Sequence, residues 1–263
     1  MSTESQQEKQ SLSGRIAVVT GGCGGIGTAV CARLAREGAQ VYAADLRGGD
    51  TIKADEVIFH EHDVSSEESA KFLMAEVERQ HGRLDILVNA AGIEIEQTIE
   101  ETSLEDWNRI FAVNVTGTFL TSKHALPLMR KAGSGSIINF GSYDGFIADP
   151  ALAAYCATKG AVHALTKAMA CDHGPENIRV NAISAGPVKT LAASGIGDFR
   201  YILKWNELNS PLRRNITIDD VGGSGLYLLS DLSSGVTGET HHVDGGYHVV
   251  GMKQEDAPDI ALD

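Results

Sequence analysis

Residues 15–27 read RIAVVTGGCGGIG, a β-branched apolar run that passes directly into a glycine-rich loop. Such a run is typical of a strand buried on both faces of a parallel sheet. The chain continues as IGTAVCARLAREG (26–38), which has helical periodicity and ends at a glycine. A strand, a glycine loop and a helix in this order predict the first βα unit of an open α/β sheet.

The alternation of strand and helix then repeats along the chain. It predicts a single α/β domain of the Rossmann type, with a doubly wound parallel sheet of about seven strands. We place this domain at residues 13–250, between a flexible N-terminal tail (1–12) and an acidic C-terminal tail (251–263). The further strands are predicted within 40–45, 56–64, 84–92, 136–142, 178–184 and 239–246, and the further helices over 66–82, 103–131 and 153–174.

Composition excludes several classes of function. The chain has 263 residues, 43% of them hydrophobic, which suffices for one large core. Its formal net charge of −13 disfavours nucleic acid and anionic membranes as partners. No apolar run approaches a membrane span, and the polar start (1–10) lacks the apolar segment of a signal peptide. Because the four cysteines also show no C-x-x-C spacing, we expect a reduced, cytoplasmic setting.

The loop TGGCGGIG (20–27) indicates a dinucleotide site because it lies between a strand and a helix. Gly21 allows the tight turn, while Gly25 and Gly27 let the backbone and the helix approach a pyrophosphate. The helix N-terminus adds partial positive charge beside the phosphates. Glycine is common in turns, so the prediction depends on this context.

Carboxylates after the next two strands refine the choice of cofactor. Asp45 ends the second strand, where it can bond the adenosine ribose hydroxyls. Asp45 would repel a 2′-phosphate, so we expect NAD, although the nearby Arg47 weakens this expectation. Asp63 and Val64 follow the third strand and are candidates for the adenine edge. Asp63 is equally well explained as a turn residue before a helix.

Four polar residues fall at strand ends or helix starts on the carboxyl side of the predicted sheet, where open α/β sheets bind ligands. They are Asn114, Ser142, Tyr155 and Lys159. Tyr155 and Lys159 are four residues apart and share a helix face. A phenol with a pKa of about 10 is a poor base at neutral pH, and a neighbouring ammonium stabilises the phenolate. We therefore expect Lys159 to lower the pKa of Tyr155 to about 7.

Taken singly, each of the four has a structural explanation. Asn114 can bond the backbone at a helix irregularity, and Ser142 can be a turn serine. Tyr155 can be a half-buried core residue, and Lys159 a solvated helix residue. Their joint occurrence at these spacings favours catalysis.

These motifs together resemble the short-chain dehydrogenase/reductase family in its Y-x-x-x-K branch. The matching elements are TGGCGGIG (20–27), NAAG (89–92), Asn114, and Ser142 thirteen residues before the Tyr155/Lys159 pair. NAAG departs from the commoner N-N-A-G. The resemblance spans about 13–250, and it implies an NAD-dependent oxidoreductase that interconverts a secondary alcohol, or a diol, and a ketone.

The same resemblance implies roles for individual residues. Tyr155 would be the general acid/base, Lys159 would also bond the nicotinamide ribose, Ser142 would orient the substrate oxygen, and Asn114 would hold a water in a proton relay. Thr190 would reach the nicotinamide carboxamide. A homotetramer is implied as well. The implied cofactor-binding residues are Gly21, Cys23, Gly25, Ile26, Gly27, Asp45, Asp63, Val64, Asn89, Ala90, Gly92, Tyr155, Lys159, Pro187, Val188 and Thr190.

The C-terminal third resembles a different branch. Residues 181–247, and SAGPVKTLAASGI (184–196) above all, are similar to the end of bacterial NADH-dependent enoyl-acyl-carrier-protein reductases. That branch normally has a longer glycine loop and a tyrosine seven residues before its lysine, and this chain has neither. The two resemblances meet in NIRVNAIS (177–184). Two hypotheses follow: a recombinant of two relatives of the same fold, or one natural protein with an unusual substrate loop.

The segment 190–212 is the expected substrate lid. Its amphipathic part, DFRYILKW (198–205), suggests an apolar or acyl substrate, although helix packing explains Phe199, Ile202 and Trp205 equally well one by one. We expect no metal, because His241, His242 and His248 lack a ligand pattern. These histidines are expected at a strand or a subunit interface.

The leading hypothesis is therefore alcohol/ketone interconversion. The alternative is reduction of an enoyl thioester with NADH, in which Tyr143 would have to replace a missing upstream tyrosine. A non-catalytic NAD-binding protein is the third hypothesis, and the complete set of four polar residues argues against it.

Overall fold

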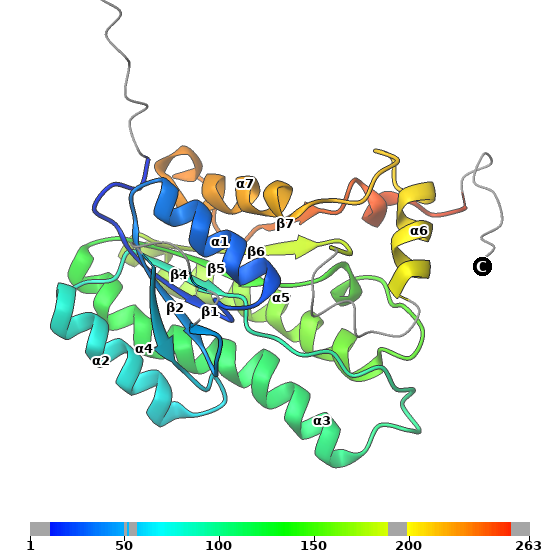
Figure 1. The fold of residues 1–263 in the computed structure, drawn as a ribbon, viewed down its shortest axis with the longest axis horizontal. Helices are drawn as coiled ribbons and strands as arrows, with labels where there is room; N and C mark the ends of the chain where they lie inside the picture. The colour runs from blue at the N-terminus through cyan, green and yellow to red at the C-terminus, as the bar shows by residue number, and fades with distance from the viewer. Residues whose placement is uncertain (1–10, 50–51, 53–56, 189–198, 254–263) are drawn as a thin grey trace, which may run out of the picture.

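The computed structural model describes residues 11–49, 52, 57–188 and 199–253. Seven parallel strands form one sheet in the order β3-β2-β1-β4-β5-β6-β7 (Figure 1). The order reverses between β1 and β4, which confirms the predicted doubly wound sheet and places a crevice at the carboxyl ends of these two strands. The strands are β1 (Ile16–Thr20), β2 (Gln40–Asp45), β3 (Val57–Glu61), β4 (Ile86–Asn89), β5 (Gly135–Phe140), β6 (Ile178–Ala185) and β7 (Thr240–Val243).

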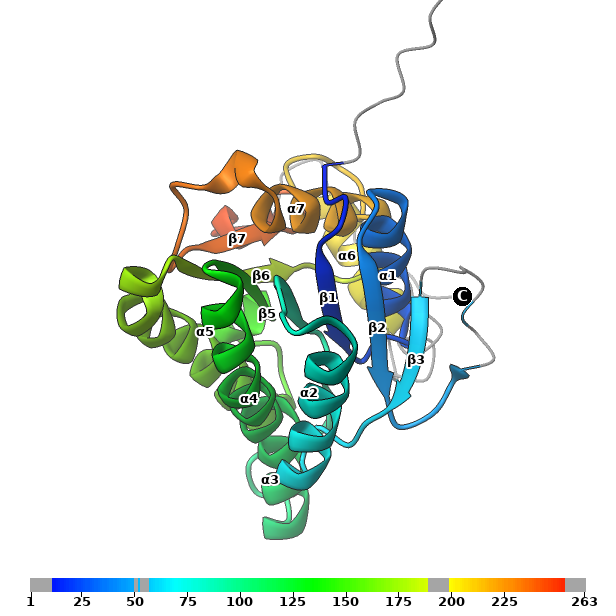
Figure 2. The same ribbon diagram turned by 90° about the vertical axis from the view of Figure 1, so that its left-hand side faces the viewer.

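Helices cover both faces of the sheet. Figure 2 shows α1 and α7 on one face, and α2, α4 and α5 on the other. α6 stands apart, beyond the carboxyl end of β6 (Figure 1). The helices are α1 (Gly25–Arg36), α2 (Glu67–His81), α3 (Leu104–Phe111), α4 (Gly117–Ala132), α5 (Ala153–His173), α6 (Phe199–Asn209) and α7 (Ile218–Leu229).

Two hydrophobic cores lie on the two faces of the sheet. Val19 and Val88 belong to the core beneath α1 and α7, whereas their neighbours Val18 and Leu87 belong to the core beneath α2, α4 and α5. Successive residues of a strand point to opposite faces, so a strand covered on both sides favours apolar residues throughout, and the buried polar residues Asn89 and Asn139 are hydrogen-bonded inside the protein. This requirement explains the uninterrupted apolar runs in the sequence.

The helix expected over 103–131 is divided in the structure. Ser103 caps α3 by accepting a hydrogen bond from the Asp106 N–H, and α4 ends at Gly133, whose φ is 78°. Between α3 and α4 the chain forms a π-helical segment, Ala112–Thr116. Such a segment inserts an extra residue into a helix and is frequent at functional sites. Here it directs Asn114 into the protein interior.

The packed part of the chain begins earlier than the sequence suggested. Leu12, assigned to the N-terminal tail, is only 2% exposed, and its N–H donates to the carbonyl oxygen of Glu37 at 2.9 Å. The predicted tail boundary at residue 12 is therefore wrong. Of the expected lid, α6 is helical, whereas residues 190–198 lie outside the described residues. No helix among the described residues is long and apolar enough to cross a membrane.

A buried carboxylate fastens the amino end of the sheet and provides a test of the fold. Asp85 Oδ2 accepts the Ile16 N–H at 2.9 Å, and the carboxylate pairs with Arg15 and Arg83. We expect Asp85→Ala to lower the free energy of unfolding by about 2 kcal/mol, since a buried N–H and two guanidinium groups lose their acceptor. Urea denaturation measures the change.

The matched control is Asp231→Ala. Asp231 is the other partner of Arg15, but its side chain is 92% exposed, against 1% for Asp85. Its loss should change the free energy of unfolding by less than about 0.5 kcal/mol. Equal losses in the two variants would show that the carboxylate of Asp85 has no special place in the fold.

Candidate active site

The glycine loop leaves room that any side chain would fill. Gly21 has φ +66°, and a Cβ there would lie 2.8 Å from the Ala91 backbone. At Gly27 a Cβ would lie 2.0 Å from the Gly21 carbonyl oxygen. α1 begins at Gly25, and Gly24 before it supplies no side-chain cap. The first amides of α1 are therefore available to an anion, and the loop fits a pyrophosphate as predicted.

Asp45 is oriented by the same loop. Its Oδ2 accepts the Cys23 N–H at 3.1 Å, and its Oδ1 accepts the Leu46 N–H at 2.8 Å. The carboxylate thus stands beside the glycine loop at the end of β2, where a ribose diol could donate to it. Cys23 contributes through its backbone, which holds Asp45 in place.

Asp63 and Val64 are engaged within the protein. Asp63 Oδ1 accepts from the Ser65 N–H at 2.9 Å and from the Ser65 hydroxyl at 2.7 Å, so Asp63 is the turn residue of the alternative interpretation. Val64 is buried, and a Cβ on Gly117 would lie 2.8 Å from its Cβ. Contact of either residue with adenine stays a prediction.

A cavity of about 540 Å³ brings most of the remaining predicted residues together. Its walls come from the first turn of α1, the segments that follow β4, β5 and β6, the first half of α5, and single turns of α3 and α6. Thr190 lies outside the described residues. The predicted residues that line the cavity are Ile26, Ala90, Gly92, Ser142, Tyr155, Lys159, Pro187 and Val188.

Asn89 does not line this cavity. Its side-chain nitrogen donates to Ser122 Oγ at 3.0 Å and to Asn139 Oδ1 at 2.9 Å. Asn139 in turn donates to Thr166 Oγ1 at 2.9 Å. The side chain of Asn89 therefore links β4, β5, α4 and α5 inside the protein, and its contact with a cofactor stays a prediction.

Lys159 and Tyr155 project from α5 toward the end of β5. Lys159 Nζ donates to the Phe140 carbonyl oxygen at 2.8 Å and lies 5.4 Å from the centre of the Tyr155 ring. Burial lowers the pKa of Lys159 to about 8. Burial raises the pKa of Tyr155, and the carboxylates of Glu94 and Asp144 raise it further. The expected lowering of the Tyr155 pKa is therefore wrong for this structure, because burial, which is the largest cause, and the two carboxylates raise the pKa instead.

Asn114 bonds backbone at a helix irregularity, as one of the two interpretations supposed. Its Oδ1 accepts the Ile93 N–H at 2.8 Å, and its Nδ2 donates to the Ile93 carbonyl oxygen at 2.9 Å and to Thr158 Oγ1 at 3.1 Å. Thr158 donates to the Tyr155 carbonyl oxygen. Asn114 thus fixes the loop after β4 against the helix that carries Tyr155. A water held by Asn114 stays a prediction.

Two residues at the site escaped the sequence analysis. Ser142 Oγ donates to Asp144 Oδ2 at 2.8 Å, and the Ser142 carbonyl oxygen accepts from His163 Nε2 at 3.0 Å. Asp144 is 7% exposed, its Oδ1 has no hydrogen-bond partner, and burial raises its pKa to about 7. The sequence carried a signal for both: Asp144 follows Ser142 by two residues, and His163 follows Lys159 by one helical turn.

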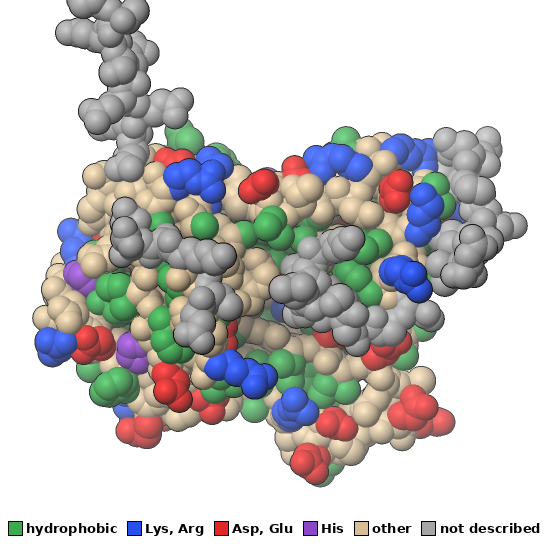
Figure 3. Space-filling view, in the orientation of Figure 1, with side chains coloured by type: hydrophobic (Ala, Val, Ile, Leu, Met, Phe, Trp, Pro, Cys, Tyr) green, Lys and Arg blue, Asp and Glu red, His purple; other side chains and the backbone are tan. Residues whose placement is uncertain are grey.

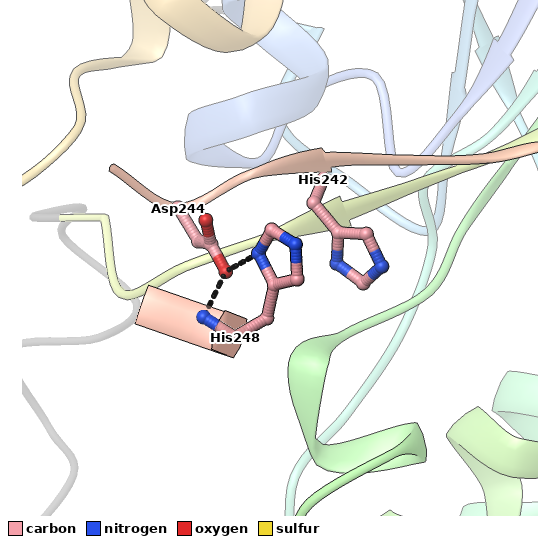
Figure 4. A group of neighbouring side chains, drawn as sticks. All are labelled: His242, Asp244 and His248. Carbon is pink, nitrogen blue, oxygen red and sulfur yellow. Dashed lines mark hydrogen bonds and ion pairs between the residues drawn. The ribbon is translucent and has the colours of Figure 1, made fainter. Parts of the chain in front are cut away.

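His242, Asp244 and His248 place their possible ligand atoms within 4.8 Å of one another (Figure 4). Asp244 already accepts the backbone N–H groups of Gly246 and His248, at 2.8 and 2.9 Å, and His248 Nδ1 at 2.8 Å. The two imidazole rings stack, with centroids 3.9 Å apart. We assign Asp244 to the turn after β7, and the position of these histidines at a subunit interface stays a prediction.

A glycine loop at the switch point of a doubly wound sheet, with Ser142, Tyr155 and Lys159 in one cavity, defines the class of NAD(P)-dependent oxidoreductases. A family model described as "Enoyl-(Acyl carrier protein) reductase" matches residues 21–248. The chain belongs to this family, within the short-chain dehydrogenase/reductase superfamily.

Relatives come from both branches of the superfamily. Enoyl-acyl-carrier-protein reductase (NADH) 1 of Rhizobium meliloti is 45% identical over 204 residues, which cover 76% of this chain and 74% of the relative. Cyclopentanol dehydrogenase of Comamonas testosteroni is 36% identical over 244 residues, which cover 90% and 98%. The NAD complex of enoyl-acyl-carrier-protein reductase from Anaplasma phagocytophilum is 38% identical and matches with a TM-score of 0.85, covering 92% of this chain and 97% of that one.

The close approach at Gly21 can be tested by adding one methyl group. Gly21→Ala should weaken NADH binding at least tenfold, because the Cβ would displace the loop from the Ala91 backbone. Gly133→Ala is the control, since Gly133 also has a positive φ (+78°) but nothing lies within 4 Å of its Cβ position. Fluorescence titration with NADH measures both. Equal NADH affinity in the two variants would contradict the assignment of the loop.

The carboxyl group of Asp144 should make the free energy of unfolding depend on pH. Its carboxyl ionises at about 4 in an unfolded chain and at about 7 in the folded protein, so between these values the folded state holds a proton that the unfolded state lacks. The contribution of Asp144 to stability therefore falls as pH rises from 4 to 7.

Asp144→Asn removes this ionisation. Relative to the wild type, the free energy of unfolding of this variant should rise as pH is raised from 5 to 8 in a series of urea denaturations. The exposed Asp172→Asn is the control for loss of one negative charge, and its difference from wild type should stay flat. A flat difference for Asp144→Asn would refute the burial of an ionising carboxyl at this position.

Proposed function

We propose that this protein is an NAD(H)-dependent oxidoreductase that interconverts a secondary alcohol or diol and a ketone. The observation that carries the proposal is the convergence of Ser142, Tyr155 and Lys159 on one cavity, at the spacing of the alcohol/ketone branch. A chain that only bound the cofactor would not need the hydroxyl groups of Ser142 and Tyr155 side by side in the same cavity.

Proton transfer is assigned to Tyr155. When bound, the nicotinamide supplies or accepts the hydride. Because burial and two carboxylates raise the pKa of Tyr155, its phenol is protonated at neutral pH and ready to donate to the oxygen of a ketone that is being reduced. Ser142 stands beside it and can hold that oxygen by a second hydrogen bond. Lys159 would stabilise the phenolate that remains.

Asp45 supports NAD rather than NADP. A carboxylate held by the Cys23 and Leu46 amides would accept from both ribose hydroxyls and would repel a 2′-phosphate. The relatives from Rhizobium meliloti and Anaplasma phagocytophilum, named for NADH and bound to NAD, are consistent with this choice.

Reduction of an enoyl thioester with NADH is the second candidate. The family description, the 45% identical relative and the position of Tyr143 in the cavity wall favour it. By similarity alone it is the better supported reaction. Two features of the site speak against it. Leu152 occupies the position seven residues before Lys159, and the Tyr143 hydroxyl is engaged in a hydrogen bond to Asp149 Oδ2 at 2.6 Å.

The two candidate reactions differ in which tyrosine turnover should depend on. Tyr155→Phe should reduce ketone reduction at least a thousandfold while NADH binding is retained, because the phenol that donates the proton is lost. Tyr143→Phe is the matched control and should keep most of the activity. Turnover is followed by NADH absorbance with a panel of ketones, and with a trans-2-enoyl thioester. Turnover of the thioester that survives Tyr155→Phe but not Tyr143→Phe would establish the second candidate.

We also propose a homotetramer, with α4, α5 and the last strand at its interfaces. Phe119 supports this, since it projects from α4 with 47% of its surface exposed. Light scattering after size exclusion should give a mass of four 27.9 kDa chains. The hypothesis of a recombinant chain stays a prediction beside these proposals.

A further inference from the structure

A second cavity, of about 400 Å³, adjoins the catalytic cavity. One end of it reaches the segment after β5, and α6 forms its far wall. A substrate that presents its carbonyl group to Tyr155 can therefore extend into this second cavity. The residues common to both cavities are Glu94, Tyr143, Asp149, Leu152, Pro187 and Ile202.

Four aromatic side chains line the second cavity, and each contacts another member of the group. Trp205 Nε1 donates to the Tyr247 hydroxyl at 3.0 Å. The rings of Tyr143 and Tyr247 meet edge to face, with centroids 5.6 Å apart, and Tyr201 and Trp205 lie nearly parallel at 6.3 Å. Aromatic walls of this kind attract cations through the negative faces of the rings, and they are the usual binding site for alkylammonium groups.

Three carboxylates line the same cavity: Glu94, Glu96 and Asp149. Among the described residues that line it, none is a lysine or an arginine. Basic side chains gather on the outside instead, around α6, where Arg200 and Lys204 are exposed (Figure 3). The described part of this cavity wall therefore carries negative charge, with Glu94 and Glu96 exposed to solvent, although the helix that forms its far wall carries positive charge outward.

Acidic side chains also line the catalytic cavity next to it. Asp144 lines that cavity, is buried, and has an oxygen atom without a hydrogen-bond partner. Its charged form is disfavoured there, since burial raises its pKa. Among the described residues of this wall, the basic side chains are those of Lys159, which donates to the Phe140 carbonyl, and the exposed Arg109. A positively charged ligand in this cavity would favour the charged form of Asp144.

We propose that the second cavity binds an ammonium group, and that the substrate is an amino ketone or the corresponding amino alcohol. This inference rests on the proposed alcohol/ketone reaction. The reaction itself is unchanged: the ketone takes up the hydride from NADH and one proton and becomes the secondary alcohol, while the ammonium group a few bonds away keeps its charge and its substituents.

An acyl chain fits this cavity less well. Its apolar surface would desolvate the carboxylates of Glu94 and Glu96 without offering them a partner, which is unfavourable. The apolar or acyl substrate expected from the sequence of α6 is therefore replaced, in this inference, by one with a cationic end. The aromatic rings that suggested apolar contacts serve a cation equally well.

The test compares two ketones of the same shape. (2-Oxopropyl)trimethylammonium and 4,4-dimethylpentan-2-one differ only in a quaternary nitrogen in place of a carbon. We expect kcat/KM with NADH to be at least tenfold higher for the cationic ketone. Because the charge also activates the carbonyl group intrinsically, the decisive quantity is how the ratio of the two values responds to mutation.

Glu96→Gln removes a charge from the second cavity without touching the catalytic residues. It should lower the ratio at least threefold, and Trp205→Leu should lower it as well. Glu100→Gln is the matched control, because Glu100 is exposed and lies outside both cavity walls. If Trp205→Leu fails to fold, Glu96→Gln still decides. A preference for the neutral ketone, or a ratio that Glu96→Gln leaves at the Glu100→Gln value, would overturn the inference.

A binding measurement separates this inference from the proposed function. Tetramethylammonium chloride is titrated into the NADH-saturated protein by calorimetry, with sodium chloride at equal ionic strength as the reference. Saturable binding that Glu96→Gln weakens supports the ammonium site even if no ketone is turned over, and then only the proposed reaction fails. Ketone turnover without binding of tetramethylammonium leaves the reaction standing and refutes the site.

Discussion

The architecture depends on one close approach of backbone to backbone. Where β1 and β4 end side by side, the turn at Gly21 lies so near the backbone of Ala91 that a methyl group would not fit between them. This contact brings the loop after β1 and the loop after β4 to the same point of the sheet edge. Parallel strands place all their carboxyl ends at this edge, so the other functional loops arrive there as a consequence of topology.

The elements that the sequence predicts well are those in which a local pattern and the tertiary fold require the same thing. Strands that are buried on both faces require runs of apolar residues, and the helix that carries Tyr155 and Lys159 requires apolar residues at helical spacing. Both patterns can therefore be recognised in the sequence. The division of the helix after Ser103 could not be predicted from the sequence. A π-helical segment differs from an α-helix by one inserted residue, and the residues around Asn114 are compatible with either form. Leu12 was misassigned for a similar reason, since one apolar residue in a polar stretch shows its burial only in the fold.

The electrostatics of the site were the least predictable part. Spacing along a helix placed an ammonium near a phenol, and that inference was sound as geometry. It could not reveal the burial of Tyr155, which is the largest cause of its raised pKa, or the carboxylates of Glu94 and Asp144, which come from other loops and raise this pKa further. A pKa depends on every charge within several ångströms, and most of these are distant in sequence. The same limit applied to the second cavity, where the carboxylates and the aromatic rings come from four separate segments of the chain.

The π-helical segment has a consequence for how this protein tolerates change in chain length. With its extra residue, α3 and α4 present faces that are rotated relative to each other, so that α3 packs against α5 while α4 packs against α2. Deletion of a single residue within 112–116 would restore a continuous α-helix and turn one half of it by roughly 100° relative to the other. The contact of α3 with α5 and the contact of α4 with α2 could not then form at the same time, and Asn114 would leave the interior. In this helix, therefore, the number of residues is a stricter requirement than the identity of most of them.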